Sequence, residues 1–446
     1  MEKQTPTESG YQHHMAIPWH DFVTDDNVTP AKDANLVERA TIVGRIGLMM
    51  LACGTGAWRV RNSMNVAAEA LGMTCSADIG LVSIEYTCMD NHRSYTQALA
   101  LPSTGVNTAR LNALENYIRE FEQQGQNWTT GEIHHALNRI ESIGGLYAPW
   151  MVGLAAALAC SAFVFLLGGG PVEMLCCFFG AGIGNYVRRK MGDRKLTLFV
   201  GLTVAVAVAC VAYDASFNVV QYFLHVNSHH EAGYIGAMLF VIPGFPFITS
   251  GLDLSKLDMR SGLERGAFAL MVITVATLVG WVVAMAMDLQ PENFIPLALS
   301  PALYLVLRLV FSFCGVFGFS IMFNSSLKMA ATAGVIGACA NTLRLEMVDL
   351  AHVPAGPAAF AGALLAGLLA SLARRRVGYP RIAITVPSIV IMVPGLYMYS
   401  AVYNLGLNSL SVAGTWAAKA ALIVVFLPLG LIAARIIADP KWRYKS

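Results

Sequence analysis

Two long apolar segments of this chain are each interrupted by a proline–glycine pair. Pro243-Gly244 lies within residues 241–251, and Pro394-Gly395 lies within residues 391–400. Proline lacks an N–H donor and glycine weakens a helix, so each helix should break at its pair. Lipid cannot satisfy the freed backbone groups, and such a break therefore needs burial in protein or a polar cavity. Interrupted spans at matching places are typical of a transporter's binding site, so both pairs are candidate substrate-binding residues. The alternative is a pair of simple kinks.

The composition is that of a polytopic membrane protein. Of the 446 residues, 56% are hydrophobic and only 13% are charged, which is more apolar than an ordinary globular protein. Ten segments approach the ~20 apolar residues that a helix needs to cross a bilayer. The predicted spans are residues 147–168, 171–188, 196–213, 233–250, 265–287, 295–320, 328–343, 357–373, 382–402 and 415–437. The expected surroundings are therefore a lipid bilayer, and the near-neutral charge balance gives no reason to expect nucleic acid.

Basic residues gather in alternate loops between these spans. They follow the even-numbered spans: Arg188, Arg189, Lys190, Arg194, Lys195, Lys256, Arg260, Arg265, Lys328, Arg374, Arg375, Arg376, Arg381, Arg435, Lys441, Arg443 and Lys445. The other loops hold Arg344, and Lys419 lies just inside the last span. The positive-inside rule then predicts a multi-pass plasma-membrane protein with both termini in the cytoplasm.

The chain divides into four predicted parts. Residues 1–33 are polar, carry several prolines and are expected to be a disordered tail. Residues 34–145 alternate helical patterns with two predicted strands, at 79–88 and 95–101, and indicate a cytoplasmic α/β domain. The ten spans then split into five-helix repeats, residues 146–290 and 291–446. An odd number of spans per repeat inverts the second repeat, which is the arrangement that alternating access uses.

A second pair of corresponding segments, besides the two Pro-Gly pairs, supports these repeats. Asn185, in a glycine-rich segment that ends at Arg188, has a counterpart in Asn341, whose segment ends at Arg344. The two amides are candidate substrate ligands. The alternative is that they make hydrogen bonds between helices.

One arginine falls in the middle of a predicted span. Arg308 lies in residues 295–320, where an arginine costs about 2.5–3.5 kcal/mol on insertion scales and usually faces a polar cavity or a partner. We predict that Arg308 anchors a substrate carboxylate. The alternative is a structural pair with Glu173 or a free carbonyl.

Carboxylates follow the first broken span. Asp253 and Asp258 are either solvated loop charges that balance Lys256 and Arg260, or carboxylates that couple proton movement or gate the transporter after partial burial raises their pKa. Glu173 is a third candidate for proton coupling or gating.

Several of these residues stand in motifs that resemble the threonine/serine exporter family. The motifs are Gly54-x-x-Ala57-x-Arg59-Val60, Pro243-Gly244-x-Pro246 followed by Asp253-Leu254, Asp258 and Ser261-Gly262, and Phe317-x-Phe319 with Phe323-Asn324. The family usually has glutamate where Arg61 stands, arginine where Leu252 stands and glycine where Leu257 stands. The resemblance covers roughly residues 35–437 and implies export of a small hydrophilic metabolite driven by an ion gradient. Some family members are two-component succinate exporters.

Other classes of protein have weaker support. No P-loop motif is present to power transport with ATP, and no cofactor is expected. Ser325-x-x-Lys328 fits a serine–lysine hydrolase motif, but its companion motifs are absent. His225, His229, His230 and Glu231 have spacing that could hold a metal, yet a solvated loop is the simpler explanation and no metal is expected.

The sequence thus predicts a mainly α-helical secondary exporter, and not an enzyme. The resemblance implies threonine or serine as the cargo, exchanged for protons, and the alternative is a dicarboxylate such as succinate. A homo-oligomer is compatible with the sequence.

Overall fold

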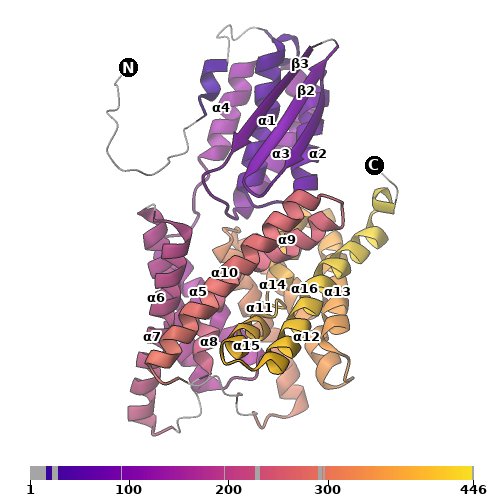
Figure 1. Cartoon of the computed structure of the whole chain (residues 1–446). Coiled ribbons are helices and arrows are strands. Elements are labelled where there is room, and N and C mark those ends of the chain that lie inside the picture. Colours follow the sequence, from indigo (N-terminus) through magenta and orange to yellow (C-terminus); the bar gives the residue numbers. More distant parts are fainter. Residues whose placement is uncertain are drawn as a thin grey trace.

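The computed structural model shows an N-terminal domain standing on a bundle of long helices (Figure 1). The structure describes residues 17–22, 29–91, 93–194, 196–226, 232–289, 294 and 297–443. The predicted fold class, mainly helical with a small N-terminal α/β part, is confirmed at this level. Most of the predicted disordered tail, residues 1–33, lies outside the described residues.

The helices and strands follow one another along the chain. Those of the N-terminal domain are α1 (Leu36–Ala52), α2 (Ala57–Ala70), β1 (Thr74–Ile79), β2 (Ser83–Asp90), β3 (Arg93–Ala100), α3 (Thr108–Gln124) and α4 (Thr130–Glu141). Those of the bundle are α5 (Pro149–Leu166), α6 (Pro171–Asp193), α7 (Leu198–Leu224), α8 (Gly233–Ala237), α9 (Gly244–Leu254), α10 (Met259–Ala286), α11 (Pro301–Met322), α12 (Leu327–Asp349), α13 (Ala355–Val377), α14 (Arg381–Val390), α15 (Gly395–Gly406) and α16 (Leu410–Ala438). Short 3-10 turns lie at Trp19–Phe22, Ala31–Asp33, Gly125–Asn127, Leu239–Val241 and Pro440–Arg443.

The N-terminal domain contains a three-stranded antiparallel sheet in the order β1-β2-β3. Helices α1 and α2 pack against the sheet. The single strand predicted for residues 79–88 is wrong, because the chain turns where the Gly80 N–H donates to the Ser83 carbonyl (2.8 Å). The apolar residues Ile79, Leu81 and Ile84 continue across this turn, so their pattern did not reveal it.

The bundle contains six single helices that are long and apolar enough to cross a membrane, counted over the described residues: α5, α7, α10, α11, α13 and α16. Two bent pairs add to these. The segment Gly233–Val241 meets α9 at 58°, and α14 meets α15 at 52°. Helices α6 and α12, at the second and seventh predicted spans, do not meet the same test of composition. The structure therefore supports six to eight spans, and the predicted count of ten stays a prediction.

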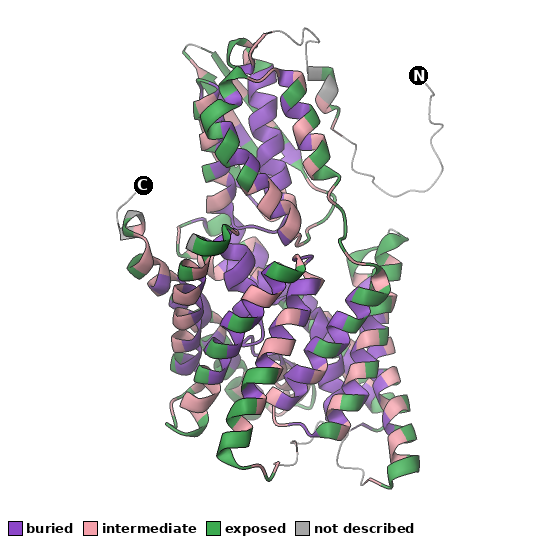
Figure 2. Cartoon of the chain, turned by 180° about the vertical axis from the view of Figure 1, so that it is seen from behind, coloured by how far each residue is buried: buried purple, intermediate pink, exposed green. Residues whose placement is uncertain are grey.

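The helices of the two halves pack in the same order. In the first half α5 contacts α6, α6 contacts α7, and α10 contacts α7 and α9. In the second half α11 contacts α12, α12 contacts α13, and α16 contacts α13 and α15. The halves meet where α5 packs on α11, α9 on α16 and α10 on α15. Buried residues fill the middle of the bundle, whereas exposed residues lie on its outer faces (Figure 2).

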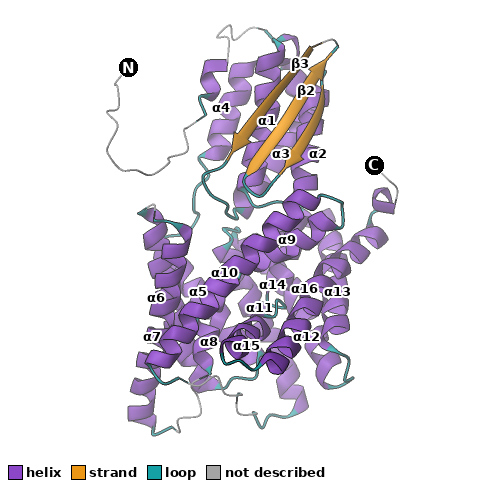
Figure 3. Ribbon diagram, in the orientation of Figure 1, coloured by secondary structure: helices purple, strands orange, loops and turns teal. Residues whose placement is uncertain are grey.

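The hairpin between α9 and α10 contains a strained residue. Leu257 has φ +64° and is 83% exposed, so no packing compensates for a backbone conformation that disfavours a Cβ. At this position the family that the sequence resembles usually has glycine. Figure 3 shows this short loop at the end of the bundle next to the N-terminal domain.

We expect Leu257→Gly to stabilise the protein. Removing the Cβ relieves the left-handed strain, which should raise the stability by about 1 kcal/mol relative to Leu257→Ala. Thermal unfolding in detergent measures the difference. Leu257→Ala is the matched control, since it removes the exposed side chain but keeps the Cβ. Equal midpoints for the two variants would contradict the account.

Candidate functional site

The two predicted breaks exist, and they have the same backbone geometry. Pro243 has φ −81° and ψ 57°, and Pro394 has φ −81° and ψ 58°. In each case the following glycine N–H donates to the carbonyl two residues back, at 2.8 Å. This is an inverse γ-turn, which lets the chain change direction and begin a new helix within one residue.

The two breaks pack against each other in the middle of the bundle. A Cβ on Gly244 would lie 2.4 Å from Val390 Cγ2, and a Cβ on Gly395 would lie 2.0 Å from Ile242 Cδ1. Each glycine therefore makes room for an aliphatic side chain from the other broken pair. All four residues of the Pro-Gly pairs are buried, which is what backbone breaks in an apolar surrounding require.

A cavity of about 780 Å³ lies on the side of the breaks away from the N-terminal domain, and we name it the distal cavity. Its wall includes Arg308 from α11, Glu346 and Asp349 from α12, and Tyr399 from α15. Helix α12 begins beside the N-terminal domain and ends at this cavity.

Arg308 is paired in the distal cavity. Its Nη1 lies 2.8 Å from Glu346 Oε1, its Nη2 bonds Asp349, and its guanidinium lies 4.6 Å from the centre of the Tyr304 ring. The structure thus places a cation and two anions in one polar cluster on the cavity wall.

The pair between Arg308 and Glu173, which was the structural alternative, does not form. Glu173 is buried and accepts the Gly170 N–H (2.9 Å) at the start of α6. The sequence reasoning overlooked the true partners, Glu346 and Asp349. Their three-residue spacing puts both carboxylates on one face of a helix, and that spacing was the available signal.

A second cavity, of about 440 Å³, lies between the first break and the N-terminal domain, and we name it the proximal cavity. Residues 240–246 form one wall, and Gly54 and Gly105 of the N-terminal domain form another. Arg188 and Arg189 line it from the end of α6. The two cavities therefore lie on opposite sides of the packed breaks.

The two predicted amides make hydrogen bonds between helices. Asn185 donates to the Val152 carbonyl of α5 (3.0 Å), and Asn341 donates to the Ser312 hydroxyl of α11 (2.8 Å). This agrees with the structural alternative. Asn185 also lines the proximal cavity, and contact of either amide with substrate stays a prediction.

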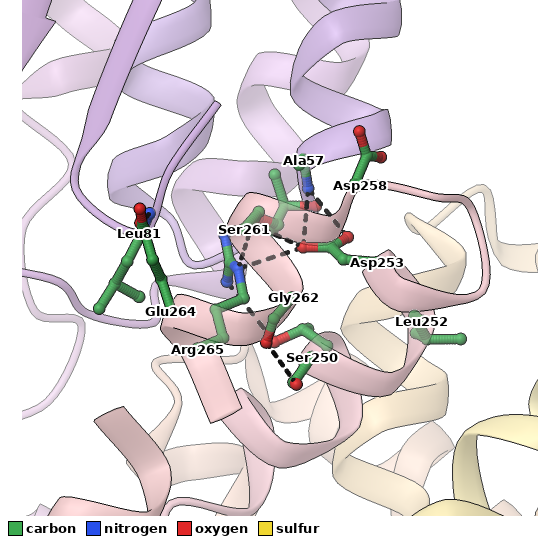
Figure 4. Close-up of polar contacts among 12 residues, drawn as sticks. Ala57, Leu81, Ser250, Leu252, Asp253, Asp258, Ser261, Gly262, Glu264 and Arg265 are labelled. Carbon is green, nitrogen blue, oxygen red and sulfur yellow. Dashed lines mark hydrogen bonds and ion pairs between the residues drawn. The ribbon is translucent and has the colours of Figure 1, made fainter. Parts of the chain in front are cut away.

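Asp253 joins the bundle to the N-terminal domain (Figure 4). It is fully buried. Its two oxygens lie 3.0 and 3.2 Å from the N–H of Ala57, the first residue of α2. Its Oδ2 also accepts the Ser261 hydroxyl (2.8 Å) and lies 3.2 Å from Arg265 Nε. A carboxylate at a helix N-terminus interacts favourably with the helix dipole.

Arg265 completes this junction from the other side. Its guanidinium donates to the carbonyls of Gly54 (3.3 Å) and Thr55 (2.8 Å). A Cβ on Gly56 would lie 2.5 Å from Asp253 Oδ1, so glycine allows the carboxylate to approach. We name Gly56, Ala57, Asp253, Ser261 and Arg265 the Asp253 latch.

The alternative that Asp253 is a solvated loop charge is wrong, because its carboxylate is fully buried. The neighbouring charges also have specific partners. Arg260 bonds Asp78 of β1. Arg61 Nη2 lies 2.6 Å from Asp258 Oδ1, so the arginine that stands in place of the family's usual glutamate has a carboxylate beside it.

The β1–β2 turn and the second half of the bundle add further contacts. Glu264 accepts the Leu81 N–H (2.5 Å), as Figure 4 shows. The Thr108 N–H, at the start of α3, donates to the Phe323 carbonyl (3.1 Å). The Asn324 side chain donates to Asn107 (2.8 Å). The N-terminal domain therefore touches both halves of the bundle.

The serine–lysine motif is structural. The Ser325 hydroxyl is buried and shares a hydrogen bond with Thr108 (2.7 Å), whereas Lys328 is exposed. The hydrolase alternative is therefore wrong. Of the predicted histidine cluster, His225 ends α7, and His229, His230 and Glu231 lie outside the described residues.

Burial shifts the pKa of several groups outside the membrane helices, among them Cys53 and Lys256. Burial raises the pKa of the Cys53 thiol to about 12, which keeps it protonated. Partial burial, aided by repulsion from Arg435, lowers the pKa of Lys256, whose ammonium lies 3.6 Å from the centre of the Trp442 ring.

The apolar helices, the two broken pairs and the paired cavities define a multi-pass membrane protein of the transporter class. The family described as "Putative threonine/serine exporter" matches residues 41–288, and the one described as "Threonine/Serine exporter, ThrE" matches residues 308–437. The chain belongs to the threonine/serine exporter family, whose members are transporters and not enzymes.

Individual relatives carry two kinds of name. A "Probable threonine/serine exporter" from Mycobacterium tuberculosis H37Rv is 22% identical over 416 residues, which cover 89% of this chain and 75% of the relative. A "Probable succinate transporter subunit YjjP" from Escherichia coli K12 is 25% identical over 250 residues, or 54% of this chain and 90% of the relative. The Klebsiella aerogenes protein of the same name is 28% identical over 244 residues, with the same coverage. No solved structure matches.

We expect Asp253→Asn to loosen the N-terminal domain from the bundle. The change leaves the buried Arg265 without its counter-charge, and breaking a buried pair in this way costs about 3–5 kcal/mol. Hydrogen exchange at residues 54–60 should accelerate more than about a hundredfold. Arg260→Gln is the control, because exposed pairs contribute about 0–1 kcal/mol. Unchanged exchange in Asp253→Asn would show that the latch does not hold the domain.

Proposed function

We propose that this protein is a secondary active exporter of threonine and serine, in which substrate passes from the proximal to the distal cavity. The observation that carries this proposal is the packing of two identical Pro-Gly breaks between two cavities. Movement of one broken pair against the other would open one cavity as it closes the other, which is alternating access.

The repeats that such a mechanism uses are supported by matching geometry. Pro394 follows Pro243 by 151 positions, and the same interval relates the hairpins that follow the breaks. Leu257 (φ 64°) corresponds to Asn408 (φ 58°), and the next residue in both cases has a ψ near 64°, with 65° at Asp258 and 63° at Ser409. We propose two inverted five-helix repeats, residues 146–290 and 291–446, in which α6 and α12 also cross the membrane and bring the number of spans from eight to ten.

We propose that the protein lies in the plasma membrane. In the proposed orientation, the N-terminal domain and both termini are in the cytoplasm. Basic side chains gather at the domain side of the bundle, among them Arg188, Arg189 and Arg260. The opposite end of the bundle carries the acidic pair of α12. The positive-inside rule supports this orientation.

The charges of the distal cavity favour an amino acid as cargo. Arg308 could bind a carboxylate while Glu346 and Asp349 bind an ammonium group, since charge-assisted hydrogen bonds of both signs would then form. A dicarboxylate would bring two further negative charges next to these two carboxylates. Like charges at such short distances are unfavourable.

A dicarboxylate such as succinate is the second candidate. Two relatives are named succinate transporter subunits, and they correspond to about half of this chain. The basic lining of the proximal cavity would also attract a dianion.

We further propose that protons couple to transport at the distal cavity. When the substrate carboxylate binds Arg308, the side chains of Glu346 and Asp349 lose part of their counter-charge. A carboxylate that loses a counter-charge binds a proton more readily. The earlier candidates are less suited to this role. Asp253 and Asp258 are held by Arg265 and Arg61, and Glu173 caps a helix.

The test is transport of labelled threonine, serine and succinate in proteoliposomes, with and without a pH gradient. We expect gradient-dependent threonine transport that falls more than about tenfold in Arg308→Gln, because a buried charge pair loses a partner. Lys328→Gln, which removes an exposed charge, is the control.

If the protein transports succinate but not threonine, the result would favour the second candidate, a dicarboxylate exporter. No transport of any of the three by folded protein would contradict the exporter proposal. Threonine transport that ignores the pH gradient would contradict proton coupling alone.

A further inference from the structure

The proximal cavity carries more positive than negative charge. Its charged lining residues are Arg188, Arg189, Asp193 and Arg265. Arg265 is neutralised by Asp253 in the latch, and Asp193 interacts with Arg189. This leaves the charge of Arg188 uncompensated by the described residues that line the cavity.

Arg188 is also without a bonding partner in the part of the chain that the structure describes. It is half-buried, and its guanidinium makes no hydrogen bond or ion pair with another described residue. Arg189 next to it is held in place, because its Nη2 donates to the Met322 carbonyl (3.1 Å). A guanidinium has five N–H donors, and keeping it half-buried and unpaired is unfavourable.

The helix dipole does not by itself explain this position. Cations are favoured in the last turn of any helix, but Lys190 and Arg194 at the same end of α6 are exposed and satisfy that preference in solvent. Arg188 instead points its charge into a cavity that also contains the first break.

The repeat-related arginine behaves differently. Arg344, which corresponds to Arg188, uses its Nε to bond Asn341 Oδ1 (3.0 Å). Helix α12, which contains Arg344, also contributes Glu346 and Asp349 to the wall of the distal cavity. The two cavities therefore differ in the sign of their excess charge, basic on the proximal side and acidic on the distal side.

We propose that the proximal cavity is the loading site for the substrate, with Arg188 as the anchor of its carboxylate group. This inference rests on the proposed transport function and assigns one of its steps. Arg188 and a carboxylate form a charge-assisted, bidentate hydrogen bond. The charge difference between the cavities makes loading on the proximal side tighter than rebinding on the distal side, which favours export.

The test is substrate binding and transport from the proximal side, in inside-out vesicles. The ligands are threonine, succinate and threoninamide, which keeps the ammonium and hydroxyl groups of threonine but lacks the carboxylate. We expect Arg188→Gln to raise the KM of threonine at least tenfold with a smaller change in kcat. Threoninamide should bind weakly and equally to wild type and variant.

Arg194→Gln is the matched control, since it removes an exposed arginine from the end of the same helix and should leave the KM unchanged. Arg188→Lys should restore part of the affinity. The proposal is overturned if Arg188→Gln keeps the wild-type KM, or if threoninamide loses affinity in this variant as much as threonine does.

The loading site and the proposed function can fail separately. Succinate binding that depends on Arg188, without threonine transport, would keep the carboxylate site and reject threonine as cargo. Threonine transport with an unchanged KM in Arg188→Gln would keep the exporter and reject the site.

Discussion

The structure depends on how the chain satisfies two backbone breaks inside an apolar bundle. A broken helix cannot face lipid, because its free N–H and C=O groups would have no partners. This chain buries each break against the other, with an inverse γ-turn at each proline. A Cβ at Gly244 or Gly395 would collide with a side chain of the other half. The two halves therefore make close contact at the breaks, where the helical hydrogen bonds are interrupted.

The Asp253 latch extends this constraint to the N-terminal domain. Helix α9 begins at Gly244 in the first break and contains Asp253 near its other end. A short helix is stiff over such a distance, so rotation at the break would shift the carboxylate that holds the start of α2. The domain also contacts Phe323 and Asn324 of the second half, and it therefore bridges the two parts that would move against each other.

The sequence predicted this centre well and its surroundings less well. The Pro-Gly pairs stand out locally, because proline and glycine act on the backbone wherever they occur. The motif residues Gly54-x-x-Ala57 and Asp253 were recognised separately, but nothing in their spacing shows that they touch across 196 positions. Arg308 was recognised as a costly buried charge, yet its partners come from another helix and depend on tertiary packing.

The remaining differences have similar causes. The turn at Gly80 was missed because apolar residues continue through it, and Arg188 was noted only as part of a basic loop. Whether a basic residue faces solvent or a cavity depends on the helix rotation and on what covers the helix end. Here the covering element is the N-terminal domain, which no local pattern in α6 can reveal.

The central claim is that one contact between the two breaks separates two cavities that open in turn. The most direct test labels Thr104→Cys in the proximal cavity and Ser400→Cys in the distal cavity with a membrane-impermeant maleimide. The labelling is measured with and without saturating threonine, in a background in which the three cysteines that are not buried, Cys75, Cys314 and Cys339, are replaced. Alternating access predicts that threonine changes the two labelling rates in opposite directions. Rates that rise or fall together, or that do not respond to threonine, would contradict the account.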